Sequence, residues 1–255
     1  MWEIFDHYTL FLMAFARMAG MILFNPFLSR KSVPIICKMG ISFFLAVLIT
    51  GTLAGTNVTI SGNIQFILFS VKELFIGFLV GFVMQLFLSV AMIAGDLTDI
   101  QLGVGMSKIY DPQSNVSMPV TGSIYNLIYS LIFFATNGHL TFIKIIFYSF
   151  EIIPPGSQPL NFGGGEYIAL FFGNMLVLAI KLALPIMAVE IISEIGLGIL
   201  MRTIPQINIF AVSIQLKLIL GLLLIIIALP GIAGFLDTML NSMLNSMVNS
   251  LTRFS

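Results

Sequence analysis

Residues 72–89 read KELFIGFLVGFVMQLFLS, an apolar stretch that begins with two adjacent charges, Lys72 and Glu73. They belong to an apolar segment, 64–95, that is longer than the roughly 20 residues a helix needs to span a bilayer. Every fourth residue from the glutamate onward is polar or small: Glu73, Gly77, Gly81, Gln85 and Ser89. Successive members rotate by only about 40° around a helix, and glycine lets a neighbouring helix approach closely. The stretch therefore predicts a long helix with one slanted contact row.

The composition indicates an integral membrane protein. The 255 residues are 58% hydrophobic and 9% charged, and their mean hydropathy is +1.07. Soluble domains average about 25% charged residues. The formal net charge is zero, and no basic patch suggests a nucleic-acid partner. A single cysteine, Cys37, excludes an internal disulfide and a cysteine-based metal cluster, and we expect no metal and no cofactor.

Six apolar segments predict an all-α fold of membrane-type helical hairpins and bent helices: 7–28, 33–53, 64–95, 123–150, 167–192 and 207–235. Asn137-Gly138 interrupts the fourth segment and favours a turn, which predicts two half-helices or one sharply bent helix. Glu151–Gly165 contains three prolines and four glycines and is expected to be an exposed loop. The tail, 239–250, reads MLNSMLNSMVNS and predicts an uncharged amphipathic helix that docks on another helix or caps the sixth segment.

Ionisable residues lie inside nearly all of these segments: Arg17, Lys72, Glu73, Lys144, Lys181, Glu190 and Lys217. A charge at the centre of a lipid-exposed helix costs roughly 2.5–3.5 kcal/mol. The helices are therefore expected to meet protein or water where the charges lie.

Two further rows with four-residue spacing place charges near glycines: Glu190, Glu194, Gly198 and Arg202 in the fifth segment, and Ser213, Lys217 and Gly221 in the sixth. Such rows either pack within the chain or face other subunits, and the sequence leaves both open. Glu190 and Glu194 repel each other unless a cation or a proton lies between them. Lys181 or Lys217 can supply the cation, and a proton relay is the weaker alternative.

The central loop, 103–122, reads GVGMSKIYDPQSNVSMPVTG and cannot form a continuous helix. It is either a connector on a membrane face or non-helical backbone in a protein-lined cavity. Asp96 and Asp99 precede it, three residues apart on one helix face. We expect them to cap the end of the third helix, and cation binding is the alternative.

Four further motifs are spread along the chain: AGDLTDIQLG (94–103), FFATNGHL (133–140), SFEIIPPG (149–156) and PQIN (205–208). In their order and spacing, over essentially the whole chain, they resemble the FliR/SctT family, whose members are subunits of the type III export apparatus. The second and third stretches are the most specific, and they resemble flagellar rather than injectisome members. Single residues at matching places are Arg17, Pro26, Pro34, Lys38, Glu73, Gly77, Gly81, Asp111, Pro112, Pro185, Glu194, Gly198 and Arg202. Leu140 and the Asn-Ser-Met tail depart from the family pattern, so the resemblance assigns no role to His139 or the tail.

The resemblance implies a FliP-like helical portion, a linker loop, a FliQ-like hairpin and a C-terminal amphipathic tail, at 1–150, 151–166, 167–235 and 236–255. It implies a pore formed with FliP and FliQ, with FlhB attached and FlhA nearby, for export of unfolded flagellar proteins. The complex would lie in the flagellar basal body at the bacterial inner membrane, in contact with lipids, with its core above the bilayer.

In this family a loop plugs the pore, and the matching positions are Gly103, Val104, Gly105, Met106, Ser107, Ile109, Tyr110, Asp111, Pro112, Val116 and Met118. The expected helix and subunit contacts are Arg17, Glu73, Gly77, Gly81, Gln85, Glu190, Glu194, Gly198, Arg202, Lys217 and Gly221. The chain is thus expected to be a channel subunit without enzymatic activity.

Two other functions have less support from the residues. A secondary transporter with charges at the midplane usually shows internal repeats with paired broken helices, and only one broken segment is evident. An intramembrane enzyme needs a nucleophile and a base on facing helices, and no motif of that kind stands out.

Overall fold

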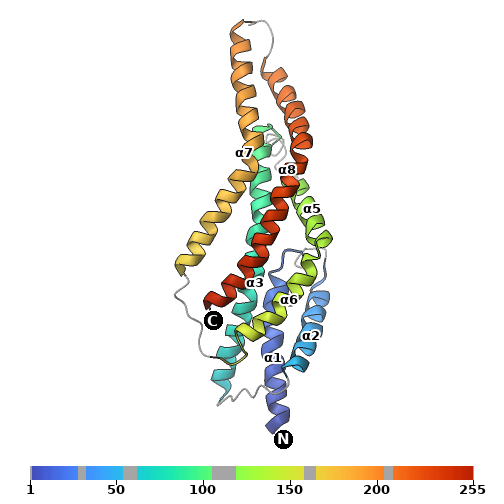
Figure 1. The fold of residues 1–255 in the computed structure, drawn as a ribbon, viewed down its shortest axis with the longest axis vertical. Helices are drawn as coiled ribbons and strands as arrows, with labels where there is room; N and C mark the ends of the chain where they lie inside the picture. Colours follow the sequence, from blue (N-terminus) through green and yellow to red (C-terminus); the bar gives the residue numbers. More distant parts are fainter. Residues whose placement is uncertain are drawn as a thin grey trace. The chain divides into compact units, whose positions relative to one another are not determined.

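The computed structural model describes residues 2–27, 33–53, 62–104, 119–157, 165–203 and 209–254. Within these ranges the chain is helical, without strands (Figure 1). The helices are α1 (Trp2–Leu23), α2 (Ile35–Thr52), α3 (Asn63–Gln101), α5 (Val120–Ala135), α6 (Gly138–Ile152), α7 (Gly165–Thr203) and α8 (Ile209–Phe254). The expected all-α fold of helical hairpins and bent helices is confirmed.

The fourth apolar segment forms two helices, as the Asn-Gly pair predicted. α5 and α6 meet at a bend of 71°. Asn137 lies between them with φ 58°, in the left-handed region that asparagine tolerates better than most residues. The bend therefore follows from a local backbone conformation encoded by the sequence.

The last two helices extend beyond their apolar segments. α7 continues past residue 192 to Thr203, and α8 continues past residue 235 to Phe254. The tail is therefore the last part of one long helix rather than a separate element. Its buried residues include Met243, Met247 and Leu251, which recur every four residues and form the apolar face expected of an amphipathic helix.

Four helical ranges are long and apolar enough to cross a membrane, judged by length and composition: Ile35–Thr52, Asn63–Gln101, Ala169–Leu200 and Ser213–Phe254. The bent pair α5–α6 makes a fifth if it counts as one span. α1 contributes only a shorter apolar helix, Tyr8–Leu23. The described residues thus contain fewer candidate spans than the six apolar segments of the sequence.

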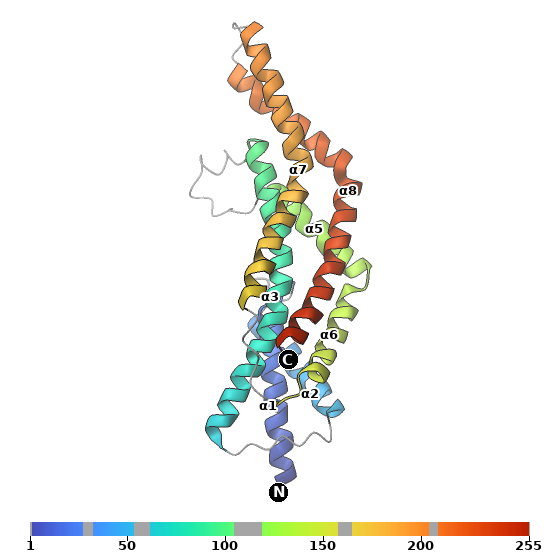
Figure 2. The ribbon, with the colours of Figure 1, turned by 60° about the vertical axis from the view of Figure 1, so that its left-hand side comes forward.

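The chain divides into two compact units. Unit 1 comprises Met1–Phe87, Asn137–Ala169 and Asn241–Ser255, and unit 2 comprises Leu88–Thr136 and Leu170–Leu240. Figure 2 shows α3 and α8 as two long helices. Each of them contributes residues to both units. This division follows contacts within one chain, so the four portions implied by the family resemblance stay a prediction.

In unit 1, the glycine row of α3 packs against α1. A Cβ added to Gly77 would lie 2.1 Å from the carbonyl oxygen of Arg17, and one added to Gly81 would lie 2.8 Å from Cβ of Phe24. Gly20 of α1 is equally close to α3, because its Cβ would lie 2.5 Å from the carbonyl oxygen of Leu74. The backbones of α1 and α3 therefore approach within a distance that only glycine permits.

Candidate functional site

Arg17 is a completely buried cation at the contact of α1 with α3. Its side chain and that of Glu73 are both 0% exposed, and Nη2 lies 2.5 Å from Glu73 Oε2. Nε donates a hydrogen bond to the same oxygen, also at 2.5 Å. Removing one partner of such a pair is expensive, because it leaves the other charge buried and uncompensated.

The rest of the Arg17 guanidinium binds the end of α6. Nη1 donates to the carbonyl oxygen of Ser149 at 2.7 Å, and Nη2 donates to that of Ile153 at 2.8 Å. The Ser149 oxygen also accepts the backbone N–H of Ile153. The carbonyl end of a helix carries partial negative charge, so a cation stabilises it. The guanidinium carbon also lies 4.0 Å from the ring centroid of Phe150, in cation–π geometry. One side chain thus connects α1, α3 and α6.

The segment that follows α6 is fastened to α3 by Lys72. The ammonium donates to the carbonyl oxygen and the hydroxyl of Ser157, at 3.0 and 2.8 Å. Ile153 and Pro155 are buried between these anchors. The expectation of an exposed loop is therefore wrong for Ile153 and Pro155, whereas Pro154 is exposed; 158–164 lie outside the described residues.

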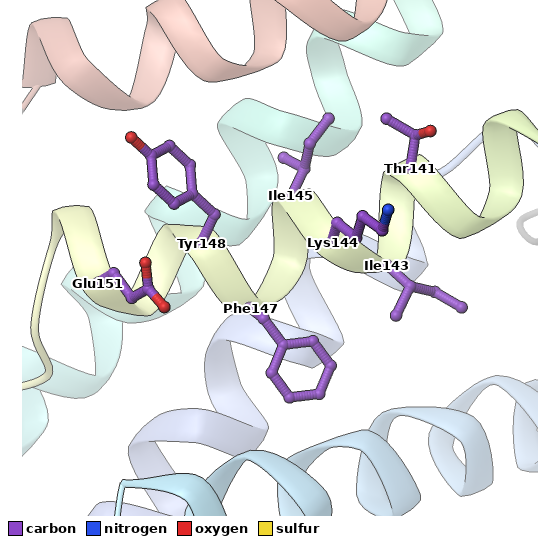
Figure 3. A pocket seen from close by; sticks show the side chains of 7 residues that line it. All are labelled: Thr141, Ile143, Lys144, Ile145, Phe147, Tyr148 and Glu151. Carbon is purple, nitrogen blue, oxygen red and sulfur yellow. The ribbon is translucent and has the colours of Figure 1, made fainter.

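An open groove of about 570 Å³ lies along α6. Seven residues of the same helix line it: Thr141, Ile143, Lys144, Ile145, Phe147, Tyr148 and Glu151 (Figure 3). Figure 3 shows Tyr148 pointing away from the side toward which Ile143 and Phe147 project, so the groove runs along a helix and is not an enclosed site.

A second cluster lies where the central loop leaves and re-enters the helices. Asp99 Oδ2 accepts a hydrogen bond from the backbone N–H of Val120 at 2.6 Å, and Oδ1 accepts from the N–H and hydroxyl of Thr121 at 3.2 and 2.5 Å. The first N–H groups of a helix lack intrahelical partners and favour a negative charge. Pro119 precedes the helix and supplies no side-chain cap. Asp99 therefore caps the start of α5, and the expectation that it caps the end of its own helix is wrong.

A close approach of two glycines adds to this contact. A Cβ on Gly95 would lie 2.0 Å from the backbone nitrogen of Gly122, so α3 and α5 nearly touch there. α3 ends at Gln101, and Gly103 two residues later has a φ of 77°, which suits a glycine after a helix. We call Gly95, Asp99, Thr121 and Gly122 the loop clasp, because together they hold both ends of the central loop.

The loop between α3 and α5 ends earlier than the expected residue 122, because residues 120–122 form the first turn of α5. Gly103 and Val104 are described, at the end of α3. The remaining plug candidates, Gly105, Met106, Ser107, Ile109, Tyr110, Asp111, Pro112, Val116 and Met118, lie outside the described residues, and their role stays a prediction.

The rows of α7 and α8 face each other in antiparallel order. Lys217 Nζ lies 3.1 Å from Glu194 Oε1. One turn away on each helix, a Cβ on Gly221 would lie 3.1 Å from Glu190 Oε1 and 1.7 Å from Cδ2 of Leu102. Of the two cations that the sequence offered to the glutamates, Lys217 is therefore the one used.

Other members of the predicted contact set are placed differently. Gly198 faces open space, with nothing within 4 Å of an added Cβ, and Gln85 is exposed. The side chain of Arg202 lies outside the described residues. The sequence did not predict that Ser149, Ser157 and Thr121 bind Arg17, Lys72 and Asp99. Each contact uses a backbone carbonyl or N–H group, which every residue type can provide.

Comparison with known proteins identifies relatives over most of the chain. Residues 8–243 match the family model described as bacterial export proteins, family 1. The flagellar biosynthetic protein FliR of Escherichia coli K12 is 30% identical over 87% of this chain and 84% of its own length. FliR of Bacillus subtilis is 27% identical over 89% of this chain and 88% of its own length. The surface presentation of antigens protein SpaR of Shigella sonnei is 30% identical over 84% of this chain and 82% of its own length.

Proposed function

Because this chain belongs to the bacterial export proteins, family 1, we propose that it is a pore-forming subunit of a flagellar type III protein export gate. Its relatives named FliR and SpaR support a component of a type III export apparatus. The four or five apolar helices support a multi-pass membrane protein. The subunit passes unfolded flagellar proteins and does no chemistry of its own.

The loop clasp is the observation that carries this proposal. Asp99, buried to 1% exposure, ties α3 to the first turn of α5 and so brings the two ends of the central loop together. Fixed ends limit the positions that the loop between them can reach. The loop sequence is rich in methionine and aliphatic residues, which can fill an irregular opening. This combination suits a plug in a channel lumen.

Exposed apolar side chains on α7 and α8 support assembly with other subunits. They include Ile192, Ile195, Ile199, Ile219, Ile226 and Ile227. Apolar surface of this extent is covered by lipid or by protein in a membrane assembly. We propose that FliP-like and FliQ-like chains cover much of it, with FlhB and FlhA as further partners at the inner membrane, and that the assembled core projects above the bilayer.

The direct test of membership in such a gate is purification in detergent, with the chain expressed alone and with candidate partner subunits. The proposal predicts a large hetero-oligomer that contains this chain and restores secretion of flagellar proteins in a strain lacking the corresponding subunit. A stable monomer that moves a small solute by itself would instead support a secondary transporter.

A further inference from the structure

Glu190 is a buried carboxyl group without a hydrogen bond. Its residue is 1% exposed, and neither Oε1 nor Oε2 has a hydrogen-bond partner in the part of the chain that the structure describes. Glu194, one turn further along α7, is 60% exposed at its side chain and pairs with Lys217. The two carboxyl groups of one row therefore have opposite environments.

The surroundings of Glu190 favour its neutral form. A Cβ on Gly221 of α8 would lie 3.1 Å from Oε1 and 1.7 Å from Cδ2 of Leu102, which directly follows α3 and fills the space beside the glycine. An ionised carboxylate that is buried without hydrogen bonds is strongly disfavoured, and such a group takes up a proton instead. The burial that would be costly for an anion is tolerated for a carboxylic acid.

Two charged groups act on this carboxyl, one from each helix of the hairpin. Glu194 of α7 is a like charge one turn from Glu190, and Lys217 of α8 carries the opposite charge. Lys217 is paired with Glu194 and lies one helical turn, about 5.4 Å along the axis, from Gly221. Leu102 of α3 brings no charge to the site.

We propose that Glu190 is a proton-binding site in which the carboxyl group is protonated while Lys217 pairs with Glu194. On release, the proton leaves to water, the Glu190 carboxylate becomes negative and Lys217 remains an ammonium. The new carboxylate then competes with Glu194 for the same cation. Loss of one proton from Glu190 is therefore coupled to a change in the ion pair of Lys217, from Glu194 toward Glu190.

Infrared spectroscopy of the full chain, purified in detergent with the export subunits that accompany it, tests this assignment. The wild-type protein is expected to show the carbonyl band of a protonated carboxylic acid, and to lose it as the pH is raised. The band is expected to be absent from Glu190→Gln and retained in Glu194→Gln, the matched control four residues away. A band that survives in Glu190→Gln, or a wild-type protein without it at any pH, overturns the proposal.

Two further arms keep the assignment falsifiable if Glu190→Gln fails to fold. In Lys217→Gln the cation that favours ionisation is gone, so the band should persist to higher pH than in the wild type. An unchanged pH of disappearance contradicts a site shared with Lys217. Titration with sodium chloride at constant pH should leave the band unchanged; its loss on adding sodium would identify a cation site instead.

Discussion

The α1–α3 contact of unit 1 and the α7–α8 hairpin of unit 2 carry the same sequence pattern with different outcomes. In both, a glutamate is followed by glycine along a row with four-residue spacing. Gly77 brings α1 so close that Arg17 reaches Glu73, and the guanidinium is satisfied on all sides. Gly198 faces open space, and Glu190 has no hydrogen bond within the described residues. A glutamate–glycine row thus predicts a helix contact. The residues on the facing helix decide whether the glutamate finds a partner within the chain.

The largest expected effect comes from breaking the buried ion pair between Arg17 and Glu73. Arg17→Met should destabilise the chain by about 3–5 kcal/mol, because Glu73 stays buried without its cation. The midpoint of thermal unfolding in detergent measures the loss. Arg17→Met combined with Glu73→Met should recover most of it, since no charge remains buried. If Arg17→Met alone is as stable as the wild type, the Arg17–Glu73 pair does not stabilise the fold.

Gly77→Ala and Gly198→Ala make the comparison at matched positions. The first places a methyl group 2.1 Å from a backbone oxygen and should cost about 1–3 kcal/mol as the helices are pushed apart. The second meets nothing within 4 Å and should stabilise α7 by about 0.5–1 kcal/mol in the isolated chain. Thermal unfolding compares the two. Equal effects would mean that the two glycines have the same surroundings, and poor assembly of Gly198→Ala with partners would place a subunit against it.

Asp99→Asn should weaken the loop clasp by about 1.5–3 kcal/mol, because hydrogen bonds to a charged acceptor are replaced by bonds to a neutral one. Amide hydrogen exchange at Val120 and Thr121 should become faster, since these donors lose the carboxylate. Asp96→Asn, three residues earlier on α3, is the matched control and should leave exchange at both amides unchanged. Identical exchange in Asp99→Asn and wild type would show that the clasp does not hold the start of α5.

The smallest effect is expected for the partly exposed ion pair between Lys217 and Glu194 in the α7–α8 hairpin. Lys217→Gln should cost about 0.2–1 kcal/mol in thermal unfolding, because Glu194 is 60% exposed and its ion pair is screened by water. High salt should reduce the difference between variant and wild type. A cost of several kcal/mol that persists in salt would instead mean that Lys217 already neutralises a buried Glu190.

The sequence predicts the helices, the bend and the charged rows, but it does not predict the partners of those rows. Apolar runs and Asn137-Gly138 carry local signals, and the structure confirms them. The bond from Arg17 to Glu73 spans 56 positions and that to Ser149 spans 132, and its acceptor on Ser149 is a backbone oxygen that every residue has. Tertiary contacts also bury Ile153 and Pro155, in a segment whose prolines and glycine indicate only a loop.

The central claim is that the loop held by the clasp seals a pore, and ion conductance measures it most directly. The assembled complex should be compared with a variant lacking residues 105–116 and with one in which a Gly-Ser segment of equal length replaces them. The account predicts that membranes with either variant leak ions, whereas the wild type stays tight. An intact permeability barrier in both variants, with normal assembly, would contradict it.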